Sequence, residues 1–144
     1  MKKKILLVTV NRSDFGIQKK LIKKLKSDNS IKFELIVTGS HYDSRFGLTY
    51  KEILREGFKI DNKIVNKSNN YDTSDVANIL SKGIYKFFNI YKKKRPDLLI
   101  ILGDRYEMFA AALPTILLGI PVAHIHGGEI TLGSFDNYFR NMIT

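Results

Sequence analysis

The sequence predicts an α/β fold built on a doubly wound, Rossmann-like parallel sheet, and three observations lead to this expectation. Short apolar, β-branched runs recur along the chain, and stretches with apolar residues at helical spacing lie between them. The last two runs are almost entirely apolar, which is typical of parallel strands that are buried on both faces. With 144 residues, of which 44% are hydrophobic, the chain can form one domain with a proper core. Elements that alternate in this way are joined by right-handed crossovers.

Five segments are expected to form the strands of this sheet. Each is a short run of Val, Ile, Leu and Phe residues that ends at a polar residue or a glycine. They are residues 4–10, 33–38, 59–65, 98–102 and 121–125.

Two expected helices follow the first and second strands. The first opens at Gly16, after the polar turn VNRSDFG, and its apolar residues share one face at spacings of four, five and eight. The second is short, covers residues 49–56 and is closed by Gly57. The apolar face of the first helix comprises Ile17, Leu21, Ile22 and Leu25.

Two further helices follow the third and fourth strands. The longest has apolar residues at helical spacing over residues 76–91, with Thr73 or Ser74 as N-cap and Pro96 beyond its end. Another is expected over residues 107–118, where Gly119 would close it. The polar stretch 66–75 is the one segment that the pattern indicates to be a mobile loop.

The C-terminal stretch SFDNYFRNMIT is typical of the opening of one more helix. Its apolar face would consist of Phe135, Tyr138 and Phe139. The sequence stops inside this helix without a cap, so residues 1–144 are expected to be one domain cut from a larger protein.

Composition excludes several classes of protein. The chain has no cysteine, so it has neither disulfides nor a thiolate nucleophile. The apolar run at the N-terminus is too short for a signal peptide, and no run approaches the roughly 20 residues that span a bilayer. A soluble, cytoplasmic protein that does not bind membranes is therefore expected.

The net charge of +10 invites a nucleic-acid-binding interpretation, but its distribution argues against one. Residues 1–100 contain 22 Lys and Arg against 10 Asp and Glu, whereas residues 101–144 contain 2 against 4. The excess is thus remote from the unusual motifs, and most of it is Lys in helical registers. A solvated face is favoured over a site for a polyanion.

Candidate site residues follow the strands, because loops at the carboxyl ends of a doubly wound sheet converge on one crevice. After the first strand, Arg12 and Asp14 precede a helix start, which favours a cradle for a diphosphate or a carboxylate; a charged capping loop is the alternative. After the second, His41 lies in TGSHYDSRFG, for which a surface loop is the better interpretation from pattern alone. After the fourth, Asp104 and Arg105 follow Gly103 directly, and an acid there is either paired or held for proton transfer.

The stretch AHIHGGE follows the fifth strand. The pattern favours an ordinary buried, hydrogen-bonded role for His124, whereas His126 is freer at the strand end. Gly127 and Gly128 permit a sharp bend or a close approach to a ligand, and Glu129 stands where a reacting group could lie.

Asp136 and Arg140 lie four residues apart, so an ordinary surface ion pair is the alternative to a role in the site. His124, His126, Glu129 and Asp136 could in principle bind zinc, but their spacing matches no established pattern, and no metal is expected. The sequence contains neither a nucleophile elbow nor a P-loop.

Taken together, these motifs resemble the N-terminal domain of the hydrolysing UDP-N-acetylglucosamine 2-epimerases of sialic and legionaminic acid biosynthesis. The resemblance covers essentially the whole chain, and its last two motifs are specific. The matching stretches are KILLVTVNRSDFG (4–16), VTGSHYDSRFGLTYKEI (37–53), DLLIILGDRYE (97–107) and IPVAHIHGGEITLGSFDNYFRNMIT (120–144).

The resemblance implies a GT-B-type fold of two Rossmann-like domains, of which this chain is the N-terminal half, and a homodimer of the full-length protein. It also implies a reaction without cofactor or metal. UDP is eliminated from UDP-N-acetylglucosamine (UDP-GlcNAc) as the C2 proton is lost, and water adds to the glycal to give N-acetylmannosamine. This chemistry requires a base near C2, an acid, and cations for the diphosphate.

The resemblance also assigns roles residue by residue. Arg12 is expected near the diphosphate, and Asp104 matches the acid/base carboxylate of the GDR motif. The base is left open among Asp104, His126, Glu129 and Asp136, because some relatives read HIEGGE where this chain reads HIHGGE. Val10 and Asn11 replace the usual Gly and Ser. The expected substrate-binding residues are Arg12, Asp14, His41, Arg105, Gly127, Gly128 and Arg140.

Two other functions stay open at this point. A non-hydrolysing epimerase would return the epimerised sugar still bound to UDP. A non-catalytic domain would bind an anionic partner through its lysines. The sequence does not distinguish GlcNAc from a 2,4-diacetamido-6-deoxy sugar as substrate.

Overall fold

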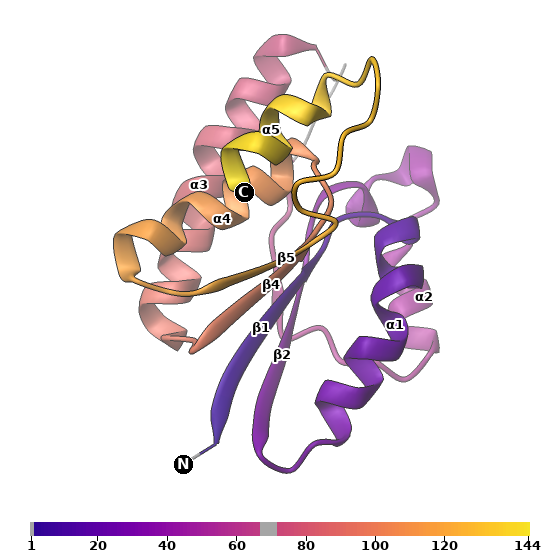
Figure 1. Cartoon of the computed structure of the whole chain (residues 1–144). Helices are drawn as coiled ribbons and strands as arrows, with labels where there is room; N and C mark the ends of the chain where they lie inside the picture. The colour runs from indigo at the N-terminus through magenta and orange to yellow at the C-terminus, as the bar shows by residue number, and fades with distance from the viewer. Residues whose placement is uncertain (1, 67–71) are drawn as a thin grey trace.

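The five strands form one parallel sheet in the order β3-β2-β1-β4-β5 (Figure 1). The structure is a computed structural model that describes residues 2–66 and 72–144. The order confirms the expected α/β fold, since the chain runs outward from β1 to one edge and then crosses over to β4 and the other edge. The strands are β1 (Lys3–Thr9), β2 (Ile31–Val37), β3 (Asn62–Lys63), β4 (Leu98–Leu102) and β5 (Val122–Ile125).

Helices cover both faces of the sheet. In Figure 1, α1 and α2 lie on one face, and α3, α4 and α5 lie on the other. Two short 3₁₀ helices, η1 (Gly39–Tyr42) and η2 (Ser44–Phe46), follow β2. The α-helices are α1 (Arg12–Ser27), α2 (Tyr50–Arg55), α3 (Thr73–Lys94), α4 (Tyr106–Leu118) and α5 (Asp136–Ile143).

The alternation of side chains along each strand produces two separate cores. In β1, Leu6 and Val8 pack beneath α3 and α4, whereas Leu7 packs with Phe15 and Ile22 of α1. All five side chains are almost fully buried. Both faces of β1 are therefore covered, as a doubly wound sheet requires.

Two helix starts differ from expectation because an earlier side chain caps the helix. The Asn11 side chain accepts a hydrogen bond from the Asp14 backbone N–H, so α1 begins at Arg12 and not at Gly16. Asp72 accepts from the Asp75 backbone N–H in the same way, so Asp72 caps α3 in place of Thr73 or Ser74. Asn and Asp are strong N-caps for this reason. The helix end at Gly119 is confirmed, with a left-handed φ of 63°.

The third strand is much shorter than the expected residues 59–65. Only Asn62 and Lys63 pair with β2, although Ile64 is buried. The apolar residues of this run thus contribute to the core without forming a long ladder. Of the expected mobile loop 66–75, residues 67–71 lie outside the described residues, and residues 73–75 belong to α3.

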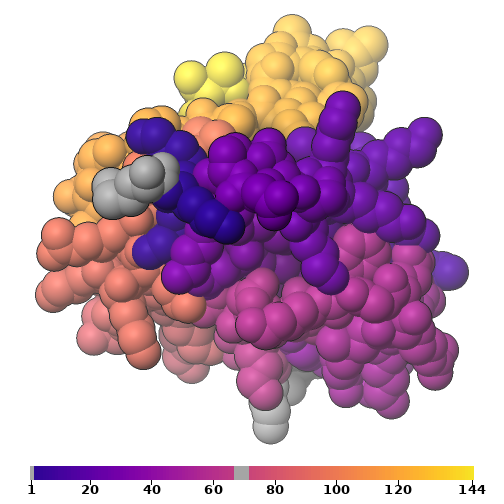
Figure 2. Space-filling model, turned by 90° about the horizontal axis from the view of Figure 1, so that it is seen from below, coloured from indigo at the N-terminus to yellow at the C-terminus, as the bar shows by residue number. Residues whose placement is uncertain are grey.

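The apolar face of α5 also differs from expectation. Phe139 is buried, but Phe135 and Tyr138 are 69% and 67% exposed, and Arg140 is buried instead. Seen from the end where β1 begins, the gold and yellow C-terminal segment projects along one side of the molecule (Figure 2). No helix in the described part of the chain is both long and apolar enough to cross a membrane.

Candidate active site

The candidate site lies at the carboxyl ends of β1, β4 and β5. β1 and β4 are neighbours, yet β1 leads into α1 on one face and β4 into α4 on the other (Figure 1). The loops that follow two such strands diverge, and ligands of open α/β sheets bind in the resulting crevice. The chain after β5 rises beyond these strand ends before it enters α5. The side chains described below show that the three segments meet.

Arg12 lies on the first turn of α1 and not in a loop. Its Nε atom is 3.0 Å from Glu52 Oε2 of α2, and its side chain is 75% exposed. The helix is capped by the uncharged side chain of Asn11, and not by Arg12 or Asp14. Arg12 remains accessible at the rim of the crevice, at the start of a helix.

Asp14 is buried close to two charged groups at the start of α4. It is 8% exposed, and it interacts electrostatically with Arg105 and Glu107. Burial raises the pKa of Asp14 from 3.8 to about 6, although Arg105 acts in the opposite direction. Its Oδ2 atom has no hydrogen-bond partner among the residues that the structure describes. Asp14 can therefore gain or lose a proton near neutral pH.

Arg105 forms the centre of the charged network at the end of β4. Its Nε and Nη2 atoms donate to the two carboxylate oxygens of Glu107 at 3.1 and 3.3 Å. The centre of its guanidinium lies 5.6 Å from the centroid of the Tyr106 ring. Burial lowers the pKa of Arg105, but Glu107, Tyr106 and Asp14 together outweigh it, so the net pKa is raised. Arg105 is thus a fixed cation.

Glu107 was not expected to belong to the site, because the sequence indicates only that it opens a helix. Its side chain is buried, at 3% exposure, where it pairs with Arg105. One feature of the sequence could have indicated its role: Glu107 is the single acid in the apolar run YEMFAAAL, and an acid that is buried requires a partner.

Arg140 connects the loop after β4 with the loop after β5. Its Nη1 atom donates to the Glu129 carbonyl at 2.6 Å, and its Nη2 atom donates to the Asp104 carboxylate. Arg140 is 6% exposed. The alternative interpretation, a surface ion pair between Asp136 and Arg140, is therefore wrong. The expected convergence of Asp104 and Glu129 on one edge of the sheet agrees with these contacts.

Asp136 lies near the same cations at the start of α5. Partial burial raises its pKa, as does the neighbouring Asp104, whereas Arg105 and Arg140 act in the opposite direction. These couplings place Asp136 in the same charged group as Asp104. In such a group the two guanidiniums can bind an anion, and a carboxyl group with a raised pKa can donate or accept a proton beside it.

His126 and Glu129 form a separate, exposed pair next to this group. His126 Nδ1 is 2.7 Å from Glu129 Oε1, and the two side chains are 45% and 59% exposed. His126 has a left-handed φ of 60°, which is uncommon for a residue with a side chain. Both groups are open to solvent and to a ligand.

His124 is hydrogen-bonded, as the sequence favours, but it is only partly buried. Its Nε2 atom donates to the Gly103 carbonyl at 2.6 Å, which ties β5 to the start of the LGDRYE loop. A Cβ atom at Gly127 would lie 2.8 Å from His124 Nδ1, so glycine permits the chain to fold back over the ring. Gly128 has a φ of 72° and also relies on glycine.

His41 lies inside the protein and not on a surface loop. It is fully buried, and its ring nitrogens form hydrogen bonds with Thr49 at 2.8 Å and with Thr9 at 3.1 Å. Burial lowers its pKa from 6.5 to about 4, so His41 is neutral at physiological pH. Its burial does not support the expected contact with substrate. His41 instead joins η1 to β1 and to the residue before α2.

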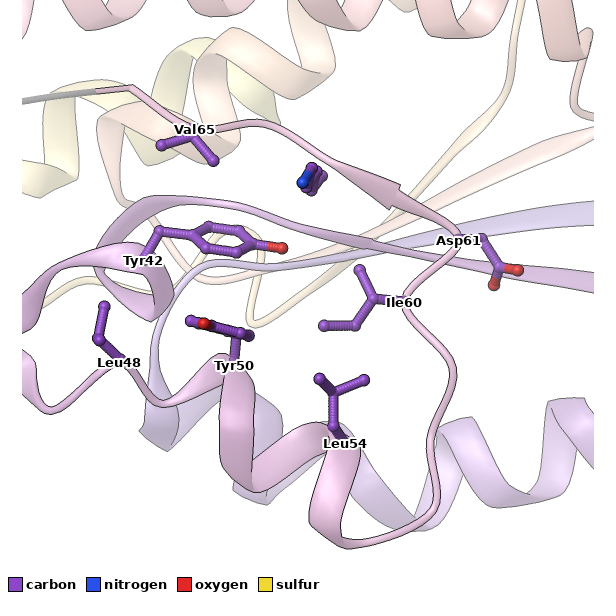
Figure 3. A pocket seen from close by; sticks show the side chains of 8 residues that line it. Tyr42, Leu48, Tyr50, Leu54, Ile60, Asp61 and Val65 are labelled. Carbon is purple, nitrogen blue, oxygen red and sulfur yellow. The ribbon is translucent and has the colours of Figure 1, made fainter.

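Two hollows lie near this edge of the sheet. One, of about 380 Å³, is lined by Asn11, Arg12, Ser13, Ser40, Phe46, Thr49 and Arg105. The other, of about 610 Å³, lies against the stacked rings of Tyr42 and Tyr50 (Figure 3). In Figure 3, Asp61 points away from the two rings, so the wall of this second hollow is mainly apolar. The smaller hollow is lined by two of the cations of the crevice, Arg12 and Arg105.

The described residues contain no group of three or more His, Cys, Asp or Glu side chains that could bind a metal ion. His124 and His126 in particular are bonded to different partners, a carbonyl and a carboxylate. The charges of the site are balanced by arginines.

Comparison with known proteins gives consistent results. Residues 23–144 match the family model described as UDP-N-acetylglucosamine 2-epimerase. The chain is 37% identical, over 99% of its length, to a Campylobacter jejuni protein named GDP/UDP-N,N'-diacetylbacillosamine 2-epimerase (hydrolyzing). It is 36% identical, over its whole length, to a Legionella pneumophila protein named UDP-N,N'-diacetylbacillosamine 2-epimerase (hydrolyzing). An Escherichia coli polysialic acid biosynthesis protein is 34% identical over 99% of the chain.

Solved structures show the same fold. The Neisseria meningitidis UDP-GlcNAc 2-epimerase bound to UDP-GlcNAc matches 97% of the chain with a TM-score of 0.82 and 22% identity. The Methanocaldococcus jannaschii enzyme in complex with UDP-GlcNAc and UDP matches the whole chain with a TM-score of 0.76. The chain spans 37% and 38% of the length of the Campylobacter and Legionella relatives. It also covers 37% of the Neisseria structure.

Proposed function

Because this chain belongs to the UDP-N-acetylglucosamine 2-epimerase family, we propose that it forms the N-terminal domain of a hydrolysing nucleotide-sugar 2-epimerase. Its substrate would be UDP-GlcNAc or a 2,4-diacetamido-6-deoxy analogue. The observation that carries this proposal is the meeting of Asp104, Asp136 and the Glu129 backbone around Arg140, beside Arg105 at the strand ends. The names of the most similar curated relatives support the hydrolysing reaction.

The proposed reaction has two steps. In the first, a base takes the proton from C2, the C1–O bond breaks, and UDP leaves with the bonding electrons, so that a C1–C2 double bond forms. In the second, water adds its hydroxyl to C1 and a proton is delivered to C2. This proton arrives on the ring face opposite to the one from which the first proton was taken, so the configuration at C2 is inverted. The net products are UDP and the 2-epimeric free sugar, and neither step needs a metal or a redox cofactor.

The described side chains match these requirements. Arg105 and Arg12 offer positive charge where the diphosphate accumulates charge on leaving. Asp136 has a raised pKa, which suits it to hold and deliver a proton when water adds. Asp104 is oriented by Arg140, whereas Glu129 and His126 lie closer to solvent. We propose that the C2 base is among Asp104, His126 and Glu129.

The proposal extends to the whole protein. We propose that a second Rossmann-like domain completes a GT-B-type cleft, that the full-length protein is a homodimer, and that it works in the cytoplasm. The proposed pathway is the synthesis of a sialic-acid-like sugar such as legionaminic acid. The absence of cysteine agrees with a reducing compartment.

The test is to incubate the full-length protein with UDP-GlcNAc and, separately, with a UDP-2,4-diacetamido sugar. Free UDP and free 2-epimeric sugar are expected in equal amounts from one of them. Release of no UDP from either substrate would contradict the proposal. Formation of a UDP-bound epimer without free UDP would identify a non-hydrolysing epimerase instead. Asp104→Asn is the comparison variant and should release UDP more slowly, because it removes the carboxylate that Arg140 orients.

A further inference from the structure

We infer that Glu107 is a positioning residue, which holds the Arg105 guanidinium so that its free edge faces the diphosphate. This inference rests on the proposed function, because it concerns how the crevice receives UDP. Nothing in the sequence motifs or in the names of the relatives assigns a role to Glu107.

Within residues 2–66 and 72–144, the hydrogen bonds of Arg105 leave one edge of its guanidinium free. Glu107 accepts from Nε and from Nη2, which together form one edge of the fork, and the guanidinium carbon lies over the Tyr106 ring. A guanidinium has five N–H donors, so the Nη1 protons and the second Nη2 proton remain available. Arg105 lines the 380 Å³ hollow together with Arg12 and Ser13 of the α1 N-terminus. Arg105 thus adds positive charge to the wall of a hollow that a phosphate group would enter.

Glu107 is itself fixed from several sides. It lies in the first turn of α4, where the helix dipole favours an acid, and its side chain is 3% exposed. A Cβ atom at Gly39 would lie 3.1 Å from Glu107 Oε1 and 2.4 Å from a Val10 methyl group. The φ of 62° at Gly39 also favours glycine. The loop after β2 therefore closes against the carboxylate and leaves it little freedom.

A positioning role fits this geometry better than a catalytic one. Glu107 is too deeply buried to contact a sugar, and Arg105 already occupies both of its oxygens. Without the Glu107 charge, Arg105 would be drawn toward Asp14 and Asp136, which both interact with it electrostatically. Rotation of the guanidinium would then move its free donors away from the crevice. Arg105 would no longer be able to bind a phosphate through two directed hydrogen bonds, which a lysine cannot do.

The experiment compares Glu107→Gln and Glu107→Asp in the full-length enzyme with the natural protein. The Gln variant is expected to raise both the UDP Kd and the KM for the UDP-sugar about tenfold, with a much smaller change in kcat. The Asp variant keeps the charge and is expected to recover part of this loss. Calorimetry with UDP and initial-rate kinetics supply the readouts. Glu34→Gln is the matched control, because Glu34 is also buried and pairs with Lys94, away from the crevice; it should leave both constants unchanged.

A double-mutant cycle tests whether Glu107 acts through Arg105. Glu107→Gln should add little to the loss of UDP affinity already caused by Arg105→Lys, because the two residues form one unit. Natural UDP affinity and KM in a folded Gln variant, or losses that add independently, would overturn the inference. If the Gln variant does not fold, the Asp variant decides: an unchanged KM overturns the inference, and a raised KM that does not add to the Arg105→Lys effect supports it. If the natural enzyme releases no UDP from any UDP-sugar, the proposed function fails instead.

Discussion

Among single residues, Asp14 gives the clearest pH dependence. Its folded-state pKa of about 6 lies above the ordinary value of 3.8, so the folded protein binds the proton more tightly than the unfolded chain does. This contribution to stability is fully present below pH 3.8 and is lost as the pH rises through about 6. The free energy of unfolding of the natural chain should therefore fall by roughly 3 kcal/mol between those limits, relative to a variant without this carboxyl group.

Asp14→Asn is that variant, since it keeps the shape of the side chain and cannot ionise. Urea unfolding of both proteins at several values between pH 3.5 and 7.5 measures the difference, in which the other titrating groups cancel. A constant difference across this range would show that Asp14 does not titrate in the way its burial implies.

Arg140 carries a second prediction at the residue level. Its two nitrogens bond to different loops, the Asp104 carboxylate and the Glu129 carbonyl, and the single ammonium of a lysine cannot reproduce both directions. Arg140→Lys in the full-length enzyme should lower kcat roughly a hundredfold, because the acidic side chains lose their relative positions. Arg55→Lys, at the exposed end of α2, is the control and should retain natural kcat. Natural kcat in the Arg140 variant would show that the two loops are held by other contacts.

Within the elements, the sequence was most informative where one local signal decides the structure. The run LLIIL predicts β4 without error, and Gly119 ends α4 because it can adopt a positive φ. The start of α1 was placed too late, at Gly16, because the sequence does not show that the Asn11 side chain reaches the backbone N–H of Asp14. The third strand was overestimated because an apolar run can fill a core without pairing as a strand.

The site was predictable only as far as topology brings strand ends together. The convergence of the loops after β1, β4 and β5 follows from a parallel sheet, and the structure agrees with it. The partners within the site do not follow from sequence spacing. Arg140 bonds to Asp104, which is 36 residues away, and not to Asp136 on its own helix. The burial of His41 likewise depends on Thr9 of β1 and on Thr49, the residue before α2.

The turn after β5 provides a prediction about an element. Gly127→Ala would place a methyl group 2.8 Å from His124 Nδ1 and 3.2 Å from its carbonyl oxygen. Because the ring is tied to Gly103, the turn must shift instead and carry Glu129 with it. Activity of the full-length enzyme should fall at least tenfold, with a loss of stability of about 1–2 kcal/mol.

Gly16→Ala is the matched control for this change. A Cβ atom at Gly16 meets nothing within 4 Å, and the residue lies inside α1 with no positive φ. This variant should be more stable than the natural protein by about 0.5–1 kcal/mol, with unchanged activity, since alanine favours a helix. Thermal unfolding and kcat/KM measure both variants. Equal effects of the two substitutions would show that the turn has no special requirement for glycine.

In the molecule as a whole, the excess of positive charge and the charged residues of the crevice lie in different parts of the sequence. The lysine-rich segments precede residue 100, whereas the acids and arginines of the crevice come mainly from residues 104–140. Several basic side chains also form ion pairs with acidic side chains outside the crevice, such as Lys19 with Glu56 and Lys94 with Glu34. The positive net charge is therefore a property of the solvated surface, and it does not indicate what the crevice binds.

Under the proposed function, the crevice of these 144 residues would form one wall of the site, and a second domain would form the other. Arg12, His126 and Glu129 have side chains that are 75%, 45% and 59% exposed, so water competes for each contact that a diphosphate would make. Elimination of UDP leaves a reactive glycal and depends on charges that act in a water-poor site. The isolated chain should therefore fold but release no UDP from UDP-GlcNAc above the background rate, while the full-length protein does so under the same conditions. Circular dichroism confirms folding, chromatography of the nucleotide measures release, and Asp104→Asn in both lengths sets the background. UDP release by the isolated chain that Asp104→Asn abolishes would mean that this single wall already holds the complete catalytic machinery.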